Sequence, residues 1–478
     1  MILSLTVAKC ALVSISSVLA QFQQVPTEAW RGQDPAPFPQ AAPNSVRLSA
    51  EALDRAGEIA ADGGSESLLI VRNGKLIYEE YWDGKKRSDV QQMYSATKSP
   101  FSFLVGRAIE TGHVKGLDQP IIDFVPEIAG EGREQLTFRN IMAMESGLNQ
   151  SRELDGRDAK AGHSQLDIVL LRSVAHKPFE WYHYNNVGYR LLFTALERAT
   201  GKSIPEFTRD ELFAPLSMHG AYWVDLVTTG KHMGYQSIRM RPIDLLKVAQ
   251  IMLDGGKWKG EQYLPKSYIE ELTEAPGPKA NPSYGLFWHL NEGDFYRTFY
   301  ESDRVEGQLM PGTPDDAIIN YGSRGQLIVA IPSLDLAWVR TGPNIPSTLW
   351  QKDSFVTQLS ATIVSAVSDE ATASNDVDWL AYGGNEQGHK YSSLDQINRE
   401  NVSNLEVVWT HNHGDIERDD FKMIAYETTP LSFEGKLYFT TPFGRVHCID
   451  GKTGKDLWSF TPEYDVLSAL KGWPVNRG

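Results

Sequence analysis

One stretch decides how the chain is interpreted: Met93-Tyr94-Ser95-Ala96-Thr97-Lys98-Ser99-Pro100. Apolar residues follow at helical spacing, so a helix is expected over residues 95–111, with Ser95 and Lys98 one turn apart on one face. A serine hydroxyl at a helix start becomes a nucleophile when a desolvated lysine beside it takes its proton. The motif alone is weak, because a capped helix with a surface lysine has the same spacing. Ser468 and Lys471 repeat that spacing and receive no catalytic weight.

A second element strengthens the interpretation. Residues 179–186 read FEWYHYNN and contain the Y-x-N pattern of Tyr184 and Asn186. A phenol beside a lysine could exchange a proton with the serine and the leaving group, and Asn186 could hold Lys98 or a substrate carbonyl. The alternative is an aromatic turn of the core, and Tyr182 and Tyr189 are expected to be packing residues of that kind.

The third element opens a late strand, where glycines would let a substrate lie along the strand edge. The N–H groups of Ser323 and Ser95 are expected to form an oxyanion hole. The alternative is an ordinary glycine bulge. The residues expected to contact substrate here are Asn320, Tyr321, Gly322 and Arg324.

In this order the three motifs resemble those of the serine β-lactamases, penicillin-binding proteins and related esterases. The likeness is greatest to class C-like esterases, including 6-aminohexanoate-dimer hydrolases, and covers roughly residues 47–368. It implies acylation of Ser95, proton transfer by Lys98 and Tyr184, release of the acyl group by water, and no cofactor or metal. Penicillin-directed members carry K-T-G as third motif, whereas this chain has Asn-Tyr-Gly with Arg324 nearby. An ester or amide substrate is therefore favoured over a β-lactam.

The order of secondary structure agrees with that resemblance. Ser49 has the chemistry of a helix cap, and residues 67–81 predict a hairpin turning at Asn73 and Gly74. Helical stretches such as 186–200 fill the middle, and strands at 325–331 and 336–340 precede a helix at 353–367. We expect an α/β (α+β) β-lactamase-like fold, in which helices flank an antiparallel sheet and form a large helical insertion.

Composition and the N-terminus limit the setting. Residues 1–20 are predicted to be an export signal, which places the protein in the periplasm or outside the cell, and residues 21–46 to be a linker. The formal net charge of −15 argues against a nucleic-acid partner, and no segment predicts a membrane span. The expected partner is a small-molecule ester or amide. Cys448 is expected to be a buried structural thiol, because Cys10 would leave with the signal.

The C-terminal part has a different texture. After a linker at residues 369–376, residues 377–478 resemble the opening of a pyrroloquinoline-quinone (PQQ)-dependent dehydrogenase propeller, most clearly in DGKTGKDLW at 450–458. The resemblance implies an all-β fragment of a propeller, from a truncated gene product or a fusion. PQQ and calcium would be cofactors only if the missing blades were present. Glu427 falls where such enzymes place a quinone-contacting glutamate and is assigned no function.

Two further functions stay open. The chain could be part of a quinoprotein dehydrogenase fusion, which requires further blades. It could also be a non-catalytic penicillin-recognising module, which predicts no covalent label at Ser95. A metal enzyme is disfavoured, because the histidines are scattered and no H-E-x-x-H occurs. His411 and His413 are predicted to be solvated rather than metal-bound.

Overall fold

The computed structural model divides the chain into two compact units, Met1–Val367 and Ser368–Gly478. In the first unit it describes residues 23–151, 153–154, 158, 163–228, 231–297, 303–343 and 354–367. In the second it describes 379, 381–382, 397, 399, 401–415, 425–426, 428–433, 435–442, 444–463 and 475–476. The predicted export signal (1–20), the predicted linker (369–376), Glu427, Ser468 and Lys471 lie outside the described residues.

A six-stranded antiparallel sheet forms the centre of the first unit, in the order β3-β2-β14-β13-β12-β9. The predicted hairpin joins β2 to β3, and Asn73 and Gly74 both take positive φ, as a two-residue hairpin turn requires. The strands are β2 (Ser67–Arg72), β3 (Lys75–Tyr81), β9 (His289–Leu290), β12 (Ile318–Gly322), β13 (Gln326–Ile331) and β14 (Leu336–Thr341).

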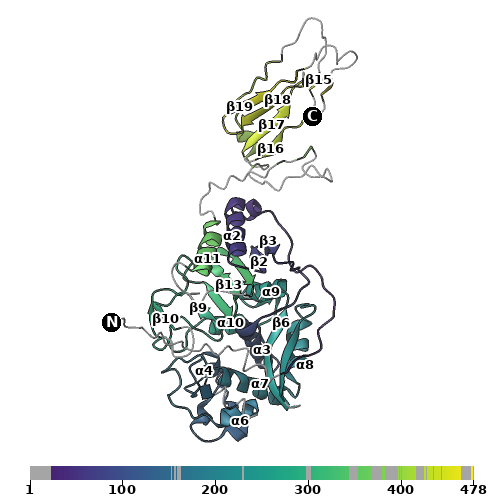
Figure 1. The fold of residues 1–478 in the computed structure, drawn as a ribbon. Coiled ribbons are helices and arrows are strands. Elements are labelled where there is room, and N and C mark those ends of the chain that lie inside the picture. The colour runs from purple at the N-terminus through teal and green to yellow at the C-terminus, as the bar shows by residue number, and fades with distance from the viewer. Residues whose placement is uncertain are drawn as a thin grey trace, which may run out of the picture. The chain divides into compact units, whose positions relative to one another are not determined.

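Both faces of this sheet are buried, which explains its near-continuous apolar strands. Alternate side chains enter two cores: Leu69 and Val71 face the larger one, Leu68 and Ile70 the smaller. Helices α2 (Ala50–Asp62) and α11 (Phe355–Ser365) lie side by side over the smaller core, and α9 (Pro242–Leu253) packs on the opposite face (Figure 1). Ser49 caps α2 by accepting the Ala52 N–H at 3.2 Å. The predicted layered α/β fold is confirmed.

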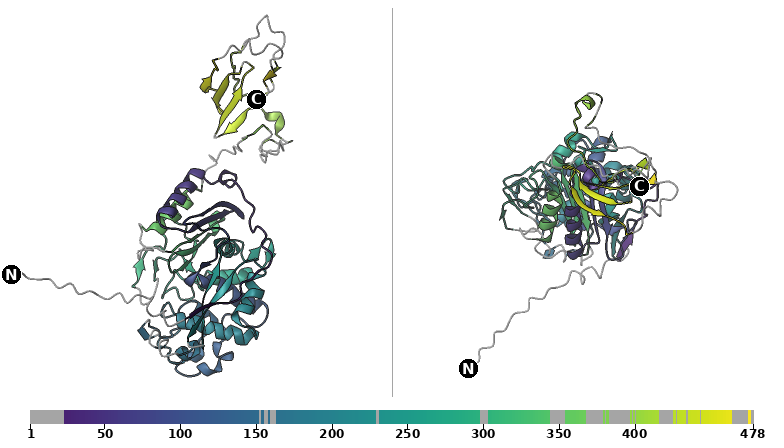
Figure 2. Two further views of the ribbon diagram at one scale, coloured as in Figure 1. Left: turned by 45° about the vertical axis from the view of Figure 1, so that its right-hand side comes forward. Right: turned by 90° about the horizontal axis from the view of Figure 1, so that it is seen from above.

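The predicted helical insertion lies between β3 and β9. Figures 1 and 2 show much of it gathered at the end of the unit away from α2. Helix α7 (Asn186–Thr200) has the predicted bounds, whereas the helix expected from residue 95 begins with a 3-10 turn, η2 (Tyr94–Thr97). The other helices are α3 (Lys98–Glu110), α4 (Phe138–Met142), α6 (Gln165–Leu170), α8 (Ile204–Thr208), the π-helical η6 (Arg209–Phe213) and α10 (Lys266–Leu272). Short 3-10 turns are η1 (Pro43–Val46), η3 (Ile121–Asp123), η4 (Pro126–Ile128), η5 (Arg133–Gln135) and η7 (Pro332–Leu334).

The segment predicted as a linker, residues 21–46, differs from that expectation where it is described. Its strand β1 (Gln23–Pro26) pairs with β5, Phe38 is buried, and the Asp34 carboxylate lies 2.6 Å from the Arg241 guanidinium at the start of α9. Its partners are distant in sequence, so its Pro-rich composition did not reveal them. Strand β1 thus belongs to a second, four-stranded sheet of the order β1-β5-β6-β4. Its other strands are β4 (Gln91–Gln92), β5 (Tyr222–Thr228) and β6 (Lys231–Met240). Two small pairs are β7 (Lys257–Trp258) with β8 (Glu261–Gln262), and β10 (Phe295–Tyr296) with β11 (Val305–Glu306).

The second unit is all-β apart from one turn, η8 (Val402–Asn404), within its described residues. Four antiparallel strands follow one another in a meander, and Cys448 is buried as predicted. They are β16 (Leu431–Phe433), β17 (Lys436–Thr440), β18 (Val446–Asp450) and β19 (Asp456–Phe460), beside a short parallel pair of β15 (Ala425–Tyr426) with β20 (Val475–Asn476). In the described parts of the whole chain, no helix has the length and apolar character needed to cross a membrane.

Candidate active site

Ser95 lies in the 3-10 turn η2, half-buried, directly before the buried helix α3. Tyr94 takes φ +48°, which a residue other than glycine rarely adopts, so the chain turns sharply just before the serine. Strand β6 holds the turn on both sides, because Met93 N–H donates to the Ile238 carbonyl and Ile238 N–H donates to Thr97 Oγ1, both at 3.0 Å. The serine is therefore presented by a fixed, strained turn.

Lys98 occupies the first turn of α3 and is 3% exposed. Its Nζ donates to Asn186 Oδ1 at 2.9 Å and lies 4.7 Å from the centre of the Tyr184 ring and 4.4 Å from that of Tyr189. Burial, and then the positive charge of Arg190, lower the pKa of the Lys98 ammonium to about 7. A large share of the amine is then neutral at neutral pH, the form that accepts a proton from a serine hydroxyl.

Tyr184 and Asn186 reach Lys98 because the start of α7 is fixed. Asn185 caps that helix by accepting the Gly188 N–H at 2.8 Å, and its own amide donates to the Leu148 carbonyl at 2.7 Å. The sequence had singled out the residues on either side of Asn185 and missed this positioning residue, although asparagine before a helical pattern is a cap signal.

The two tyrosines expected to be packing residues do pack in the core. Tyr182 meets Tyr284 edge to face at 5.3 Å, and Tyr189 meets Phe101 in the same way at 5.2 Å. Tyr189 also covers Lys98, and burial raises the pKa of its phenol well above the ordinary value. Its phenol therefore stays protonated, and its ring covers one side of the Lys98 amine.

Gly322 brings the third element against the serine turn. A Cβ on Gly322 would lie 2.2 Å from the Met93 carbonyl oxygen and 2.9 Å from Ala96 N, so only glycine allows this approach. The strand then turns, with Gly325 N–H donating to the Gly322 carbonyl. Ser323 is exposed on this turn, and the Arg324 guanidinium lies 5.7 Å from the Tyr94 ring centre. The oxyanion role of Ser323 N–H stays a prediction.

Asn320 and Tyr321 are placed differently from the expected substrate contacts. Asn320 is buried and its amide donates to the Phe287 carbonyl at 2.7 Å. Because side chains alternate along a strand, Tyr321 points to the other face of the sheet, where it packs against the smaller core. Strand β9 pairs only with Ile318 and Ile319, so the described residues leave the edge of β12 at 320–322 without a strand partner. A substrate would meet backbone there rather than these two side chains.

Glu145 is a buried group whose importance the sequence did not reveal. Its side chain is fully buried, and neither carboxylate oxygen has a hydrogen-bond partner. Burial raises its pKa to about 9, so the carboxyl is protonated at neutral pH. The available signal was a charged residue within a largely apolar run, Ile141–Leu148.

A cavity of about 240 Å³ adjoins the start of α7. Gln150 lines it and accepts the Val187 N–H of α7 at 3.4 Å, and His183 lines it one residue before Tyr184. His176 stacks on Trp181 at 5.3 Å between ring centres and forms an aromatic wall. Among the described cavities, this one has the lining residue that is nearest in sequence to a partner of Lys98, because His183 directly precedes Tyr184.

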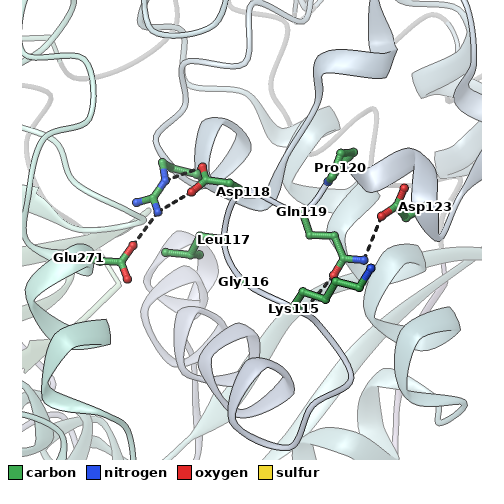
Figure 3. A pocket seen from close by; sticks show the side chains of 9 residues that line it. Lys115, Gly116, Leu117, Asp118, Gln119, Pro120, Asp123 and Glu271 are labelled. Carbon is green, nitrogen blue, oxygen red and sulfur yellow. Dashed lines mark hydrogen bonds and ion pairs between the residues drawn. The ribbon is translucent and has the colours of Figure 1, made fainter.

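Another hollow, of about 510 Å³, is lined by charged side chains that pair with one another (Figure 3). Arg139 lies between Asp118, at 2.8 Å, and Glu271, at 2.6 Å, and Gln119 donates to Asp123 at 3.0 Å. These contacts engage Arg139 and the three carboxylates, and the hollow contains none of the predicted site residues.

A serine on a strained turn, a buried lysine of lowered pKa and a glycine strand edge, carried by this layered fold, define the penicillin-recognising class of serine hydrolases. A family model described as beta-lactamase matches residues 58–301, just over half of the chain. The chain therefore belongs to the beta-lactamase family, whose serine hydrolases need no cofactor.

Solved structures agree on the fold. A protein described as a 6-aminohexanoate-dimer hydrolase from Bacillus anthracis superposes with a TM-score of 0.54 at 19% identity, covering 72% of this chain and 90% of that one. EstCE1, a hydrolase with promiscuous acyltransferase activity, superposes with a TM-score of 0.51 at 14% identity, covering 67% and 99%. At these identities the likeness shows the fold alone.

The second unit has separate relatives. A family model for the beta-propeller domain of glucose/ethanol/alcohol dehydrogenases (PQQ) matches residues 379–478. The quinoprotein glucose dehydrogenase of Escherichia coli is 38% identical over 104 residues, which are 22% of this chain and 13% of that protein. The quinone alcohol dehydrogenase subunit of Gluconobacter oxydans is 36% identical over 116 residues, 24% of this chain and 14% of that one. The chain thus spans about one seventh of these relatives, and both parts of the predicted resemblance are confirmed.

Proposed function

We propose that the protein is an exported serine hydrolase that cleaves an ester or amide through an acyl-enzyme on Ser95. The observation that most directly supports this function is the buried Lys98. Its pKa is lowered to about 7, and its Nζ donates to Asn186 Oδ1 at 2.9 Å. An ordinary surface lysine, with a pKa near 10.4, would have almost no neutral amine at neutral pH.

The reaction would proceed in two halves. Neutral Lys98 accepts the hydroxyl proton as Ser95 Oγ attacks the substrate carbonyl carbon, and the backbone N–H groups of Ser95 and Ser323 receive the oxyanion. Tyr184 passes a proton to the leaving group as its bond to the carbonyl carbon breaks. A water then attacks the acyl carbon and gives a proton to the Tyr184 phenolate, while Lys98 returns its proton to Ser95 Oγ as the acyl–oxygen bond breaks. The acid and the free serine are released.

The third motif supports an ester or amide rather than a β-lactam. Asn320 stands where penicillin-directed relatives carry a lysine, and its amide is already bound to the Phe287 carbonyl. Arg324, which follows this strand, lies on the exposed turn beside Tyr94. A β-lactam carboxylate would therefore lack the buried cation that the K-T-G motif supplies.

A fluorophosphonate probe followed by intact-mass analysis and peptide mapping tests the proposal. One adduct at Ser95 is expected, and Ser95→Ala should abolish labelling and turnover while far-ultraviolet circular dichroism stays unchanged. Ser468→Ala, in the second S-x-x-K of the chain, is the matched control and should label fully. A folded wild-type protein without an adduct would favour the binding module instead.

Export is proposed from residues 1–20 alone. Expression of the full chain in a Gram-negative host should give a periplasmic protein whose intact mass corresponds to a chain that starts at Gln21. A cytoplasmic product that keeps these residues would refute this part.

The match of residues 379–478 favours a second candidate, a contribution to a PQQ-dependent dehydrogenase within a longer protein. The described residues do not fit a quinone site, because they build only one four-stranded sheet and one short pair of strands, and the outer strand β19 exposes Leu457, Trp458 and Phe460. We therefore derive no step through that cofactor. Reduction of an acceptor dye by this chain with PQQ, calcium and an alcohol would establish the candidate, and no reduction would confine it to longer proteins.

A further inference from the structure

Three side chains from separate parts of the second unit converge at one point. His447 lies on β18, Asp456 opens β19, and His411 comes from the segment before the sheet. Asp456 Oδ1 lies 2.9 Å from His447 Nδ1 and 3.2 Å from His411 Nε2. One donor atom from each residue lies within 4.8 Å of those of the other two.

These distances suit a single small ion. Zinc binds histidine nitrogen and carboxylate oxygen at about 2.0–2.2 Å, so neighbouring ligand atoms of a tetrahedral site are separated by roughly 3.3 Å. The two measured separations are close to that value. The hydrogen bonds now joining the carboxylate to the imidazoles would give way to bonds with the ion, and each imidazole would bind as the neutral ring.

The surroundings hold the two rings in place. Phe439 stacks on His447 with the ring planes 7° apart, and it meets His411 edge to face at 5.5 Å. His447 is 6% exposed and the side chain of His411 is 10% exposed, whereas Asp456 is half-exposed. His447 is bonded to Asp456 through its Nδ1, whereas its buried Nε2 has no hydrogen-bond partner. The exposed side at Asp456 leaves room for a fourth ligand from water.

The local charge also favours a cation. Asp456 brings a carboxylate to the point where the two imidazoles meet. The nearby cation, Arg445, is paired with Asp415. This arrangement differs from the expectation that His411 is solvated, whereas His413 stays outside the three-residue set.

We propose that His411, His447 and Asp456 bind one divalent transition-metal ion, with a fourth position open to solvent. Two imidazoles and one carboxylate are the ligands of zinc and its first-row neighbours, whereas calcium and magnesium prefer oxygen alone. The proposal is independent of hydrolysis at Ser95.

Zinc titration of the chelator-treated full chain, followed by calorimetry, tests this site. The wild type should bind one equivalent, and His411→Gln and Asp456→Asn should each weaken binding at least tenfold. His413→Gln, which changes a neighbouring histidine outside the set, is the matched control and should bind as the wild type does. Loss of hydrolysis in Ser95→Ala with zinc binding intact would show that the two sites are separate.

Cobalt gives an independent measurement that does not depend on a buried variant folding. The wild type with one equivalent of Co²⁺ should show visible absorption bands of a four-coordinate ion, and Asp456→Asn should lose them. The proposal is overturned if the wild type takes up no stoichiometric zinc, if both ligand variants bind as tightly as the wild type, or if binding is lost with His413 instead.

Discussion

Replacing Asn186 by aspartate tests the central electrostatic claim with almost no change in shape. The amide oxygen that now accepts from Lys98 Nζ at 2.9 Å would become a carboxylate oxygen in the same place. The present pKa of about 7 corresponds to roughly 5 kcal/mol in favour of the neutral amine relative to a free lysine. A carboxylate in contact with the amine offsets part of that preference, because it stabilises the charged form.

The expected magnitude follows from the pKa. An opposite charge at this distance raises a lysine pKa by about 1–3 units, so the neutral fraction at pH 7 falls from about one half to between about a tenth and a thousandth. Acylation at pH 7 should slow by about 5- to 500-fold. The loss should shrink as the pH rises through the new pKa, because the neutral amine is then restored.

The assay is the rate of fluorophosphonate labelling from pH 6 to 10, followed by mass spectrometry, which needs no knowledge of the natural substrate. The wild-type rate should rise with a midpoint near 7, and that of Asn186→Asp with a midpoint shifted upward. Asn186→Ala removes the acceptor without adding charge and should keep its midpoint near 7. An Asn186→Asp profile that overlays the wild type would show that Lys98 is not the base, and a wild-type midpoint near 10 would show that its pKa is not lowered.

Three further predictions concern the fold around the site. Glu145 is protonated when folded and ionised when unfolded between pH 4.5 and about 9, so its contribution to stability is complete below pH 4.5 and falls as pH rises to about 9. Glu145→Gln should therefore reduce the fall in the free energy of unfolding over that range by about 1.4 kcal/mol per pH unit, measured by urea denaturation. Gly322→Ala should destabilise the protein by about 1–3 kcal/mol and impair labelling, whereas Gly116→Ala, where a Cβ meets nothing within 4 Å, should do neither. Deletion of residues 368–478 should leave labelling at Ser95 near full strength, and collapse of the shortened protein would show that the second unit is structural.

Local sequence sufficed where the physics is local. Helix α7 could be placed at residues 186–200 because its apolar spacing is regular. The hairpin at Asn73 and Gly74 could be placed because those two residues tolerate positive φ. The three motifs could be brought together only through the family resemblance, since no local rule sets Gly322 against the Met93 carbonyl.

Sequence failed where a residue's partner lies far along the chain. Nothing near Asn320 shows that its amide would bind the Phe287 carbonyl, and nothing near Asp34 shows that it would pair with Arg241. The predicted start of the helix at residue 95 was wrong for another reason. A 3-10 turn has almost the same residue preferences as an α-helix, so the sequence does not separate η2 from α3. His411 and His447 are 36 positions apart and meet only because the meander folds back.

The two units differ in how much of their apolar sheet surface is covered by their own residues. In the first, both faces of the central sheet are covered by its own helices, and the serine, the lysine and the glycine edge all come from this unit. In the second, β19 exposes Leu457, Trp458 and Phe460 by about half each, and adjacent residues of a strand face opposite sides. A sheet with exposed apolar groups on both faces gains less from burial than one covered on both sides, and a bound ion that links β18, β19 and the preceding segment would offset part of that deficit. We therefore expect labelling at Ser95 to need only the first unit, whereas the proposed ion would stabilise the second.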